Sequence, residues 1–130
     1  MIAAEAFGSW LRRYGEAWIR GDPRAALKLF TDDAAYCETP FEPPRVGSDA
    51  IRRYWTEGAQ EGQRDVTFAA QALGLAGDTG CARWQATFVR LPQRSFVELD
   101  GVLAARFSPD GRCCESREWW HRRETPAAAR

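Results

Sequence analysis

Residues 98–121 read ELDGVLAARFSPDGRCCESREWWH, with two stretches of strand character on either side of the segment Ser108–Gly111 (SPDG). Proline at the second position of a turn, aspartate at the third and glycine after it are favoured in a tight type I turn. The stretch therefore predicts a long β-hairpin. Its second strand ends in Trp119 and Trp120. Successive strand residues point to opposite faces, so one face can be the core and the other needs a helix, a pocket or a second copy of the protein.

The length of 130 residues is that of one domain. We expect this domain to span residues 1–124, followed by a disordered tail at residues 125–130. Six tryptophans are many for this length. Large aromatic side chains bury much area and often line pockets and interfaces. The composition therefore favours a globular domain with either a pocket or an interface.

The 18 basic and 18 acidic side chains are interspersed and give a formal net charge of zero. We therefore expect neither a nucleic-acid partner nor a membrane partner, since each would need a cluster of basic charge. Charged residues interrupt any apolar run within residues 1–20, which indicates a cytoplasmic protein without a signal peptide.

The four cysteines form no Cys-x-x-Cys pair and are expected as buried thiols. His121 is the only histidine, and no glycine-rich phosphate loop follows a predicted strand. We therefore expect no metal and no cofactor.

Three helices are expected in the first half of the chain. Residues 3–20 carry an apolar stripe at helical spacing and end at Gly21. Asp22 is the expected cap of a second helix that has Pro23 at its first position, runs to about Thr31 and buries Phe30. A third helix is expected to begin with Ser48 as its cap and to unwind over residues 58–63.

Strands are expected at residues 34–39, 65–75, 79–91, 95–107 and 112–122. Helices that precede a run of strands indicate an α+β domain. We expect a cone-shaped, strongly bent antiparallel sheet with the three N-terminal helices packed on its concave face. Gly101 lies inside the strand at 95–107, where glycine often marks a bulge that shifts the face pattern.

Several short motifs follow one another in an ordered series. They are Tyr14 seven residues before Gly21-Asp22, then Asp32-Asp33-Ala34, Pro40-Phe41, Pro43-Pro44, Gly47, Ile51, Gly80-Cys81, Leu99-Asp100, Arg106-Phe107, Gly111-Arg112 and Trp120. This series resembles the nuclear transport factor 2-like superfamily, which includes the SnoaL-like polyketide cyclases and the ketosteroid isomerases. The resemblance covers nearly the whole chain and implies the cone fold. It indicates function only weakly, because this fold hosts many unrelated activities.

The resemblance to the isomerases can be followed residue by residue. It places their oxyanion-donating tyrosine at Tyr14 and the tyrosine that supports it at Trp55. Their general base falls at Thr39, whose hydroxyl has no useful basicity near neutral pH. Their second oxyanion acid falls at Leu103, which cannot donate a proton. The sequence therefore argues against authentic ketosteroid isomerisation, while a pocket and one tyrosine donor remain.

If Trp120 faces inward, as the resemblance implies, strand alternation also turns Ser116 and Glu118 inward. The expected ligand-binding residues are Trp18, Phe30, Thr39, Phe41, Trp55, Trp84, Phe88, Leu103, Ser116 and Trp120. A mainly aromatic lining with few polar groups is typical of a small-molecule site. The alternative is a filled hydrophobic core, because six tryptophans can fill space as easily as line it.

Three residues are the catalytic candidates. Tyr14 is expected to polarise a carbonyl group, and Glu118 or Asp100 to move a proton. A carboxyl group among tryptophans should have a raised pKa, although an ion pair of Glu118 with an arginine such as Arg83 or Arg106 is the alternative. Asp100 faces the cavity only if Gly101 bulges the strand. Glu38 should point away from Thr39 and is expected to be a surface or inter-strand partner.

The opposite sheet face would carry Trp119 among charged residues, a pattern typical of an interface. We expect a homodimer with Trp119 buried in it, as is common in the resembled superfamily. Three functions remain open from the sequence. They are a cofactor-free isomerase, cyclase or dehydratase acting on a small hydrophobic molecule, a binding module for such a molecule, and a structural dimer without a ligand.

Overall fold

The computed structural model of the protein describes residues 2–127. Its elements, in chain order, are α1 (Ala4–Arg20), α2 (Pro23–Leu27), β1 (Phe30–Cys37), β2 (Arg45–Val46), α3 (Ser48–Trp55), the π-helical turn η1 (Thr56–Gln60), β3 (Gln63–Ala76), β4 (Thr79–Arg90), β5 (Ser95–Phe107) and β6 (Cys113–Thr125). The α+β class expected from the sequence is confirmed.

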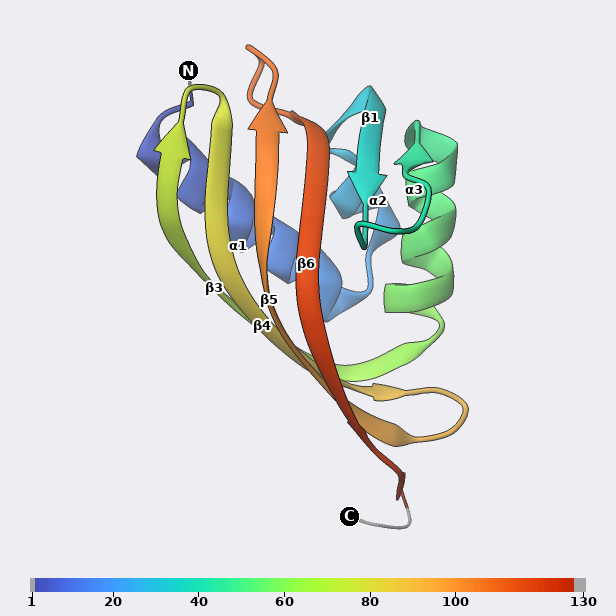
Figure 1. Ribbon diagram of the computed structural model, residues 1–130. Coiled ribbons are helices and arrows are strands. Elements are labelled where there is room, and N and C mark those ends of the chain that lie inside the picture. Colours follow the sequence, from blue (N-terminus) through green and yellow to red (C-terminus); the bar gives the residue numbers. More distant parts are fainter. Residues whose placement is uncertain (1, 128–130) are drawn as a thin grey trace.

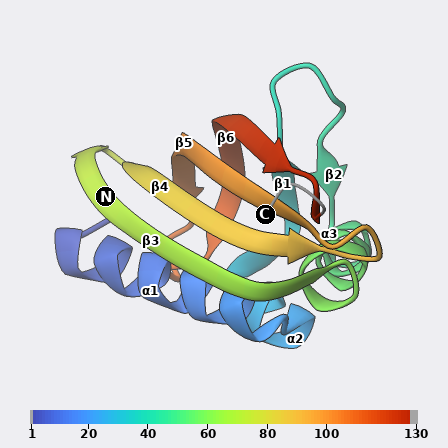
Figure 2. The same cartoon turned by 90° about the horizontal axis from the view of Figure 1, so that it is seen from below.

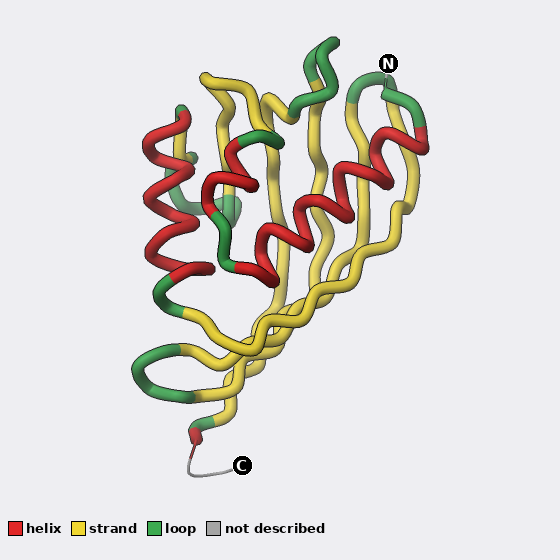
Figure 3. The backbone as a smooth tube through the Cα atoms, turned by 180° about the vertical axis from the view of Figure 1, so that it is seen from behind, coloured by secondary structure: helices red, strands yellow, loops and turns green. Residues whose placement is uncertain are grey.

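The strands form one six-stranded sheet in the order β2-β1-β6-β5-β4-β3. Strands β3 to β6 pair as antiparallel neighbours, whereas β1 lies parallel to β6. The long strands curl strongly, and their lower halves sweep beneath α3 (Figure 1). Seen from behind, the helices lie on one side of the sheet (Figure 3), and the view from below shows α1 and α2 along the inside of the curl (Figure 2). The sheet and helices thus enclose the core between them.

The local signals at the first two helices act as expected. Gly21 ends α1 in the left-handed conformation, with φ of 60°, which glycine adopts without steric cost. The Asp22 side chain accepts a hydrogen bond of 3.1 Å from the Ala25 backbone N–H, and Pro23 is the first residue of α2. These two signals fix the sharp reversal between the helices.

Three helix boundaries differ from the expectation. α2 ends at Leu27, and Phe30 begins β1 and is buried there, because it pairs with Cys113 of β6. Strand pairing therefore overrides the helical tendency of residues 28–31. Ser48 is the first residue of α3, and Gly47 occupies the cap position without a side-chain hydrogen bond. The chain does not unwind at Gly58, because α3 continues into η1.

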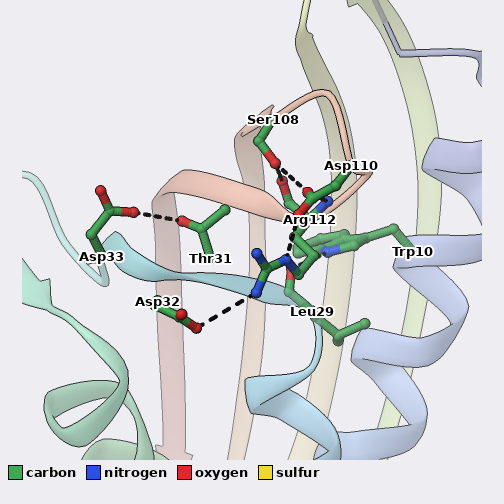
Figure 4. Close-up of polar contacts among 8 residues, drawn as sticks. All are labelled: Trp10, Leu29, Thr31, Asp32, Asp33, Ser108, Asp110 and Arg112. Carbon is green, nitrogen blue, oxygen red and sulfur yellow. Dashed lines mark hydrogen bonds and ion pairs between the residues drawn. The ribbon is translucent and has the colours of Figure 1, made fainter.

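The expected tight turn of the β5–β6 hairpin is present, with the Gly111 N–H donating to the Ser108 carbonyl at 3.0 Å. Figure 4 shows the polar contacts that hold this turn in place. Arg112 Nε lies 2.8 Å from Asp110 Oδ2, and its Nη1 lies 3.6 Å from Asp32 Oδ1 in β1. Trp10 Nε1 donates to the Leu29 carbonyl at 3.0 Å. The hairpin turn, the start of β1 and α1 are thus held together at one end of the molecule.

Gly101 does not bulge its strand, so this expectation is wrong. Gly101 pairs with Trp84 on one side and Trp120 on the other, in unbroken register. A Cβ atom at Gly101 would overlap the Trp119 carbonyl oxygen and would lie 2.7 Å from Trp120 Cβ. Glycine is therefore required by the close approach of β6 and not by a change of register.

The tail expected at residues 125–130 lies partly outside the described residues. Thr125 is not part of a tail, because it is the last residue of β6 and pairs with Phe96. None of the helices within residues 2–127 combines the length and the apolar character that crossing a bilayer would require.

Candidate functional site

A cavity of about 370 Å³ lies between the concave face of the sheet and the helices. Its aromatic wall comes from α1, α3, β1, β4 and β6. Its polar groups come from β1, the β1–β2 loop, the start of β3, the end of β4 and the second half of β6. The lining residues are Tyr14, Trp18, Tyr36, Glu38, Thr39, Glu42, Tyr54, Trp55, Gly58, Ala59, Gln63, Trp84, Phe88, Arg90, Leu99, Glu118, Trp120 and Arg122. Four of the six tryptophans therefore line a space and do not fill it.

Glu118 is the most buried carboxyl group of the cavity, with 5% of its surface exposed. Its Oε2 atom accepts a hydrogen bond of 2.8 Å from the Tyr14 hydroxyl. The Tyr36 hydroxyl lies 2.8 Å from the Tyr14 hydroxyl and 3.4 Å from the same Oε2. Each hydroxyl has one proton, so the shorter distances define a chain in which Tyr36 donates to Tyr14 and Tyr14 donates to the carboxylate.

The second oxygen of this carboxyl group, Oε1, accepts no hydrogen bond from the residues that the structure describes. Glu118 lines the cavity. Oε1 is therefore the atom that a bound molecule can reach, while Oε2 is occupied by the tyrosine pair.

The pKa of Glu118 is raised from 4.5 to about 7. Burial is the main cause, because desolvation penalises the charged form, and the charge of Glu38 raises the pKa further. The nearby hydroxyl groups of Tyr14 and Tyr36 lower the pKa, with the larger effect from the hydrogen bond that Tyr14 donates. The pKa values of both tyrosines are raised well above 10.0, chiefly by burial and then by the charge of Glu118. Near neutral pH the tyrosines are therefore donors, and Glu118 can serve as an acid or a base.

A second carboxyl group, that of Glu38, lies in the same cavity. Its side chain accepts a hydrogen bond from the Tyr54 hydroxyl and lies 3.6 Å from Arg45 Nη1. The Arg45 guanidinium group sits 4.2 Å from the centre of the Tyr54 ring, a cation–π distance. Trp120 Nε1 donates to the Glu38 backbone carbonyl at 2.9 Å. Glu38 is thus held by three neighbours, and its charge is compensated by an arginine.

The residues expected at the site fall into three groups. Eight line the cavity, and they are Tyr14, Trp18, Thr39, Trp55, Trp84, Phe88, Glu118 and Trp120. Phe30, Leu103 and Ser116 are buried in the core and are absent from the cavity lining. Phe41 lies in the β1–β2 loop, is 97% exposed and is absent from the cavity lining. The expectation that these last four residues line the pocket is wrong.

Asp100 lies on the outer face of the sheet, which contradicts its expected place beside the substrate. Without a bulge at Gly101, strand alternation turns Asp100 outward, where its Oδ2 lies 2.8 Å from Arg83 Nη2 and 3.1 Å from Gln85 Nε2. Arg83 is therefore not a partner of Glu118. Arg106 is not one either, since it pairs with Glu115 at 3.7 Å.

Tyr36 and Glu38 are site residues that the sequence reasoning missed, and Glu38 was expected to point elsewhere. Ala34, Tyr36 and Glu38 alternate toward the inside, which is a signal present in the sequence. Taking Thr39 as inward hid this signal. In the structure β1 ends at Cys37 and the chain bends at residues 38–39, so Glu38 and Thr39 both reach the cavity.

Comparison with known proteins agrees with this architecture. The family model for the SnoaL-like domain matches residues 11–116, and the chain belongs to this family within the nuclear transport factor 2-like superfamily. A search of curated protein sequences found no match.

Three similar solved structures have low sequence identity, so they establish the fold alone. The epoxide hydrolase/cyclase-like enzyme SalBIII of salinomycin pyran ring formation is 22% identical, with a TM-score of 0.74 over 90% of this chain and 88% of its own. A computationally designed 17-OHP binder is 16% identical, with a TM-score of 0.78 over 89% and 94%. The Δ5-3-ketosteroid isomerase from Mycobacterium sp. is 14% identical, with a TM-score of 0.78 over 92% and 98%.

Proposed function

We propose that this protein is a cofactor-independent enzyme that moves a proton within a small, mainly hydrophobic molecule bound in the cavity, in an isomerisation, cyclisation or dehydration. The observation that carries the proposal is Glu118. Its buried carboxyl group forms part of the cavity wall, has a pKa of about 7 and offers Oε1 to a ligand. A carboxyl group with a pKa near the working pH is suited to both taking and returning a proton.

In an isomerisation, the Glu118 carboxylate would take a proton from one carbon of the substrate and return it to another. The C–H electron pair becomes part of the shifted double bond, so no oxidant or reductant is needed. The tyrosine chain holds Oε2 in place and stabilises the charged form before the proton arrives. Tyr14 then acts through Glu118, as a positioning residue, because its proton is already directed at the carboxylate.

The comparison with the isomerases supports a rearranged version of their site. The position that the resemblance assigns to their second acid is Leu103, and Glu118 is the direct cross-strand partner of Leu103. The tyrosine that supports their donor is replaced by Trp55, whose ring packs edge-on against Tyr14 at 5.5 Å. Tyr36 supplies the hydrogen bond to Tyr14 instead. We propose that the site keeps the combination of a carboxyl group with tyrosine hydroxyls, with the carboxyl group from β6 and the tyrosines from α1 and β1.

Exchange of solvent deuterium into 2-tetralone, a bicyclic ketone with acidic α-protons, tests the proposal without knowledge of the natural substrate. The wild-type protein should accelerate exchange, with a rate that rises through pH 7 as Glu118 ionises. Glu118→Gln should abolish the acceleration. The matched control is Glu115→Gln, which changes a carboxyl group of the same strand that pairs with Arg106 outside the cavity. Exchange that survives in Glu118→Gln would contradict the proposal.

A binding module without turnover is the second candidate function. It is favoured by the buried indole N–H groups of Trp55 and Trp84, two residues of the cavity wall, because neither group has a hydrogen-bond partner within residues 2–127. Such groups are ready donors for a ligand. The designed 17-OHP binder shows that this fold can be used for binding. Under this alternative, Glu118→Gln should leave the affinity for hydrophobic ligands unchanged, and no protein variant should accelerate exchange.

We also propose that the protein is a cytoplasmic homodimer joined through the outer sheet face. Trp119 is 43% exposed on that face and Val102 lies directly across from it. Both would be covered in a dimer. The four cysteines are free thiols, as is usual in a reducing compartment. Light scattering at micromolar concentration should give the mass of two chains, and Trp119→Glu should give the mass of one. A monomeric wild-type protein would contradict the dimer.

A further inference from the structure

The polarity of the cavity changes in one direction along the strands that form its floor. On β6 the inward-facing residues run from Glu118 through Trp120 to Arg122. On β4 they run from Trp84 through Phe88 to Arg90. On both strands an aromatic side chain is thus followed, further along the strand, by an inward-facing arginine. The side chains of Arg90 and Arg122 are 31% and 52% exposed, so these arginines mark the mouth of the cavity.

We infer that the mouth holds an oxyanion subsite, and that the cavity accepts elongated molecules with an apolar body and a carboxylate at the end remote from Glu118. The inference rests on the proposed function only in taking this cavity as the substrate site. Arg90 and Arg122 would bind the carboxylate, and Gln63 would assist them. The reacting part of the molecule would lie at the closed end.

The Glu124 carboxylate lies beside the Nε edge of both guanidinium groups. Arg90 Nε lies 3.0 Å from Glu124 Oε2, and Arg122 Nε lies 3.9 Å from Glu124 Oε1. Hydrogen bonds from Ser95 and Arg90 hold the pKa of Glu124 below its ordinary value, so it stays charged. Within residues 2–127 no acceptor is bonded to the Nη atoms of either arginine. The guanidinium groups are thus oriented and still have donors for a planar carboxylate.

The charges at the mouth match a monovalent anion. Arg90 and Arg122 outnumber Glu124 and leave one positive charge at the arginine cluster. Gln63 pairs with Arg90 across β3 and β4, and its Oε1 accepts a hydrogen bond of 2.6 Å from Trp18 Nε1, which leaves its amide donors free to turn to the cavity. Three acidic residues also face the cavity, and one of them, Glu118, lies at the closed end. Glu38 is compensated by Arg45, and Glu42 lies in the exposed β1–β2 loop.

The strand sets the length of the molecule. Glu118 and Arg122 are four residues apart on one face of β6, which corresponds to roughly 13 Å along an extended strand. Trp84, Trp120, Phe88 and Leu99 line the space between them. A compact ligand cannot reach both ends, whereas an extended chain can. The geometry thus selects for length, apolar character and terminal charge together.

The test compares octanoate with 1-octanol, which has the same chain without the charge, by quenching of tryptophan fluorescence. Wild-type protein should bind octanoate at least tenfold more tightly than octanol. Arg90→Gln and Arg122→Gln should each weaken octanoate binding about tenfold, as expected for loss of a charge-assisted hydrogen bond at a partly exposed site. Octanol affinity should stay within about twofold. Glu42→Gln should strengthen octanoate binding, because it removes an opposing charge.

The matched control is Arg123→Gln, which makes the same change one residue further along β6. Arg123 faces outward and pairs with Glu98 at 2.8 Å. It should leave octanoate binding unchanged. If a variant fails to fold, salt dependence of the wild-type protein replaces it, and octanoate but not octanol should bind more weakly at high salt.

Glu118→Gln separates this inference from the proposed function, since it should lose deuterium exchange and keep the preference for octanoate. Equal affinity for octanoate and octanol, or no octanoate binding, would overturn the subsite whatever the exchange assay shows.

Discussion

The two oxygens of Glu118 have different surroundings, and the proposed proton transfer depends on this difference. Oε2 is fixed by Tyr14 at 2.8 Å, while Oε1 remains available to a ligand. The tyrosine pair lowers the pKa against the strong effect of burial, so the value of about 7 is a balance of two opposing causes. Removing either tyrosine hydroxyl should therefore raise the pKa of Glu118.

Tyr14→Phe should raise the pKa of Glu118 above about 7, because the carboxylate loses its shortest hydrogen bond. Tyr36→Phe should raise the pKa by less, since its hydroxyl lies 3.4 Å from the same oxygen. The measurement is a titration of the Glu118 side-chain carboxyl carbon by NMR. Tyr54→Phe is the control, because Tyr54 donates to Glu38 and makes no hydrogen bond to Glu118. A lower Glu118 pKa in Tyr14→Phe would show that the tyrosine does not stabilise the carboxylate.

At the scale of elements, the packing of β5 against β6 depends on one missing side chain. Gly101 stands between Trp84 and Trp120 in register, and the β6 backbone occupies the space that a Cβ would need. The two tryptophans can then flank the same point of the cavity floor. A substitution at this position should push β5 and β6 apart.

Gly101→Ala should lower the free energy of unfolding by about 1–3 kcal/mol, the usual cost of forcing an extra group into a packed site. It should also change the environment of Trp120, seen as a shift in its fluorescence. Gly74→Ala is the matched control, because no atom lies within 4 Å of the Cβ position at Gly74 in β3. Urea unfolding of both variants measures the two free energies of unfolding. Equal values would contradict the close approach of the β6 backbone to Gly101.

The elements also show which parts of the fold could be predicted from the sequence. The Ser108–Gly111 turn and the Gly21 helix end were predictable, because each depends on residues adjacent in the chain. The inward direction of Glu118 was predictable from its alternation with Trp120. Phe30 was placed wrongly at the end of a helix, because it pairs with Cys113 of β6, which lies far away in the sequence.

The candidate site was less predictable than the fold. Tyr36 was missed because a bend after Cys37 breaks the alternation used to assign the faces of β1. Asp100 was placed by supposing a bulge that backbone pairing does not show. The arginines at the mouth carry no local signal, because scattered arginines meet only when the sheet curls.

At the scale of the whole molecule, burial of an ionisable group couples the site to global stability. Glu118 has a pKa of about 7 in the folded protein against an ordinary value of 4.5. The folded state therefore binds more protons than the unfolded state between these values. Protonated Glu118 therefore contributes to the free energy of unfolding. This contribution is fully present below pH 4.5 and is lost as the pH rises through 7. The shift corresponds to about 3 kcal/mol.

Wild-type protein should accordingly lose about 3 kcal/mol of unfolding free energy between pH 5 and pH 8, relative to Glu118→Gln. Glutamine cannot ionise, so the variant should show a flatter profile over this range. Urea unfolding at pH 5, 6, 7 and 8 gives the difference directly. The surface carboxyl groups with lowered pKa values, such as Asp110 and Glu124, act below this range and should affect both proteins alike. If the stability profiles of the wild type and Glu118→Gln were parallel, Glu118 would not change its charge between pH 5 and pH 8 in the folded protein.

The parallel pairing of β1 with β6 has a consequence for how the protein folds. Tyr36 and Glu118 are 82 residues apart in the chain, and Tyr14 and Glu118 are 104 residues apart. Strand β6 is the last of the described strands, yet it sits in the middle of the sheet, between β1 and β5. During synthesis the edge of β1 that pairs with β6 therefore stays unpaired until β6 has been made. Contacts of such long range slow folding, and the cluster of Tyr14, Tyr36 and Glu118 can form only once β6 is in place.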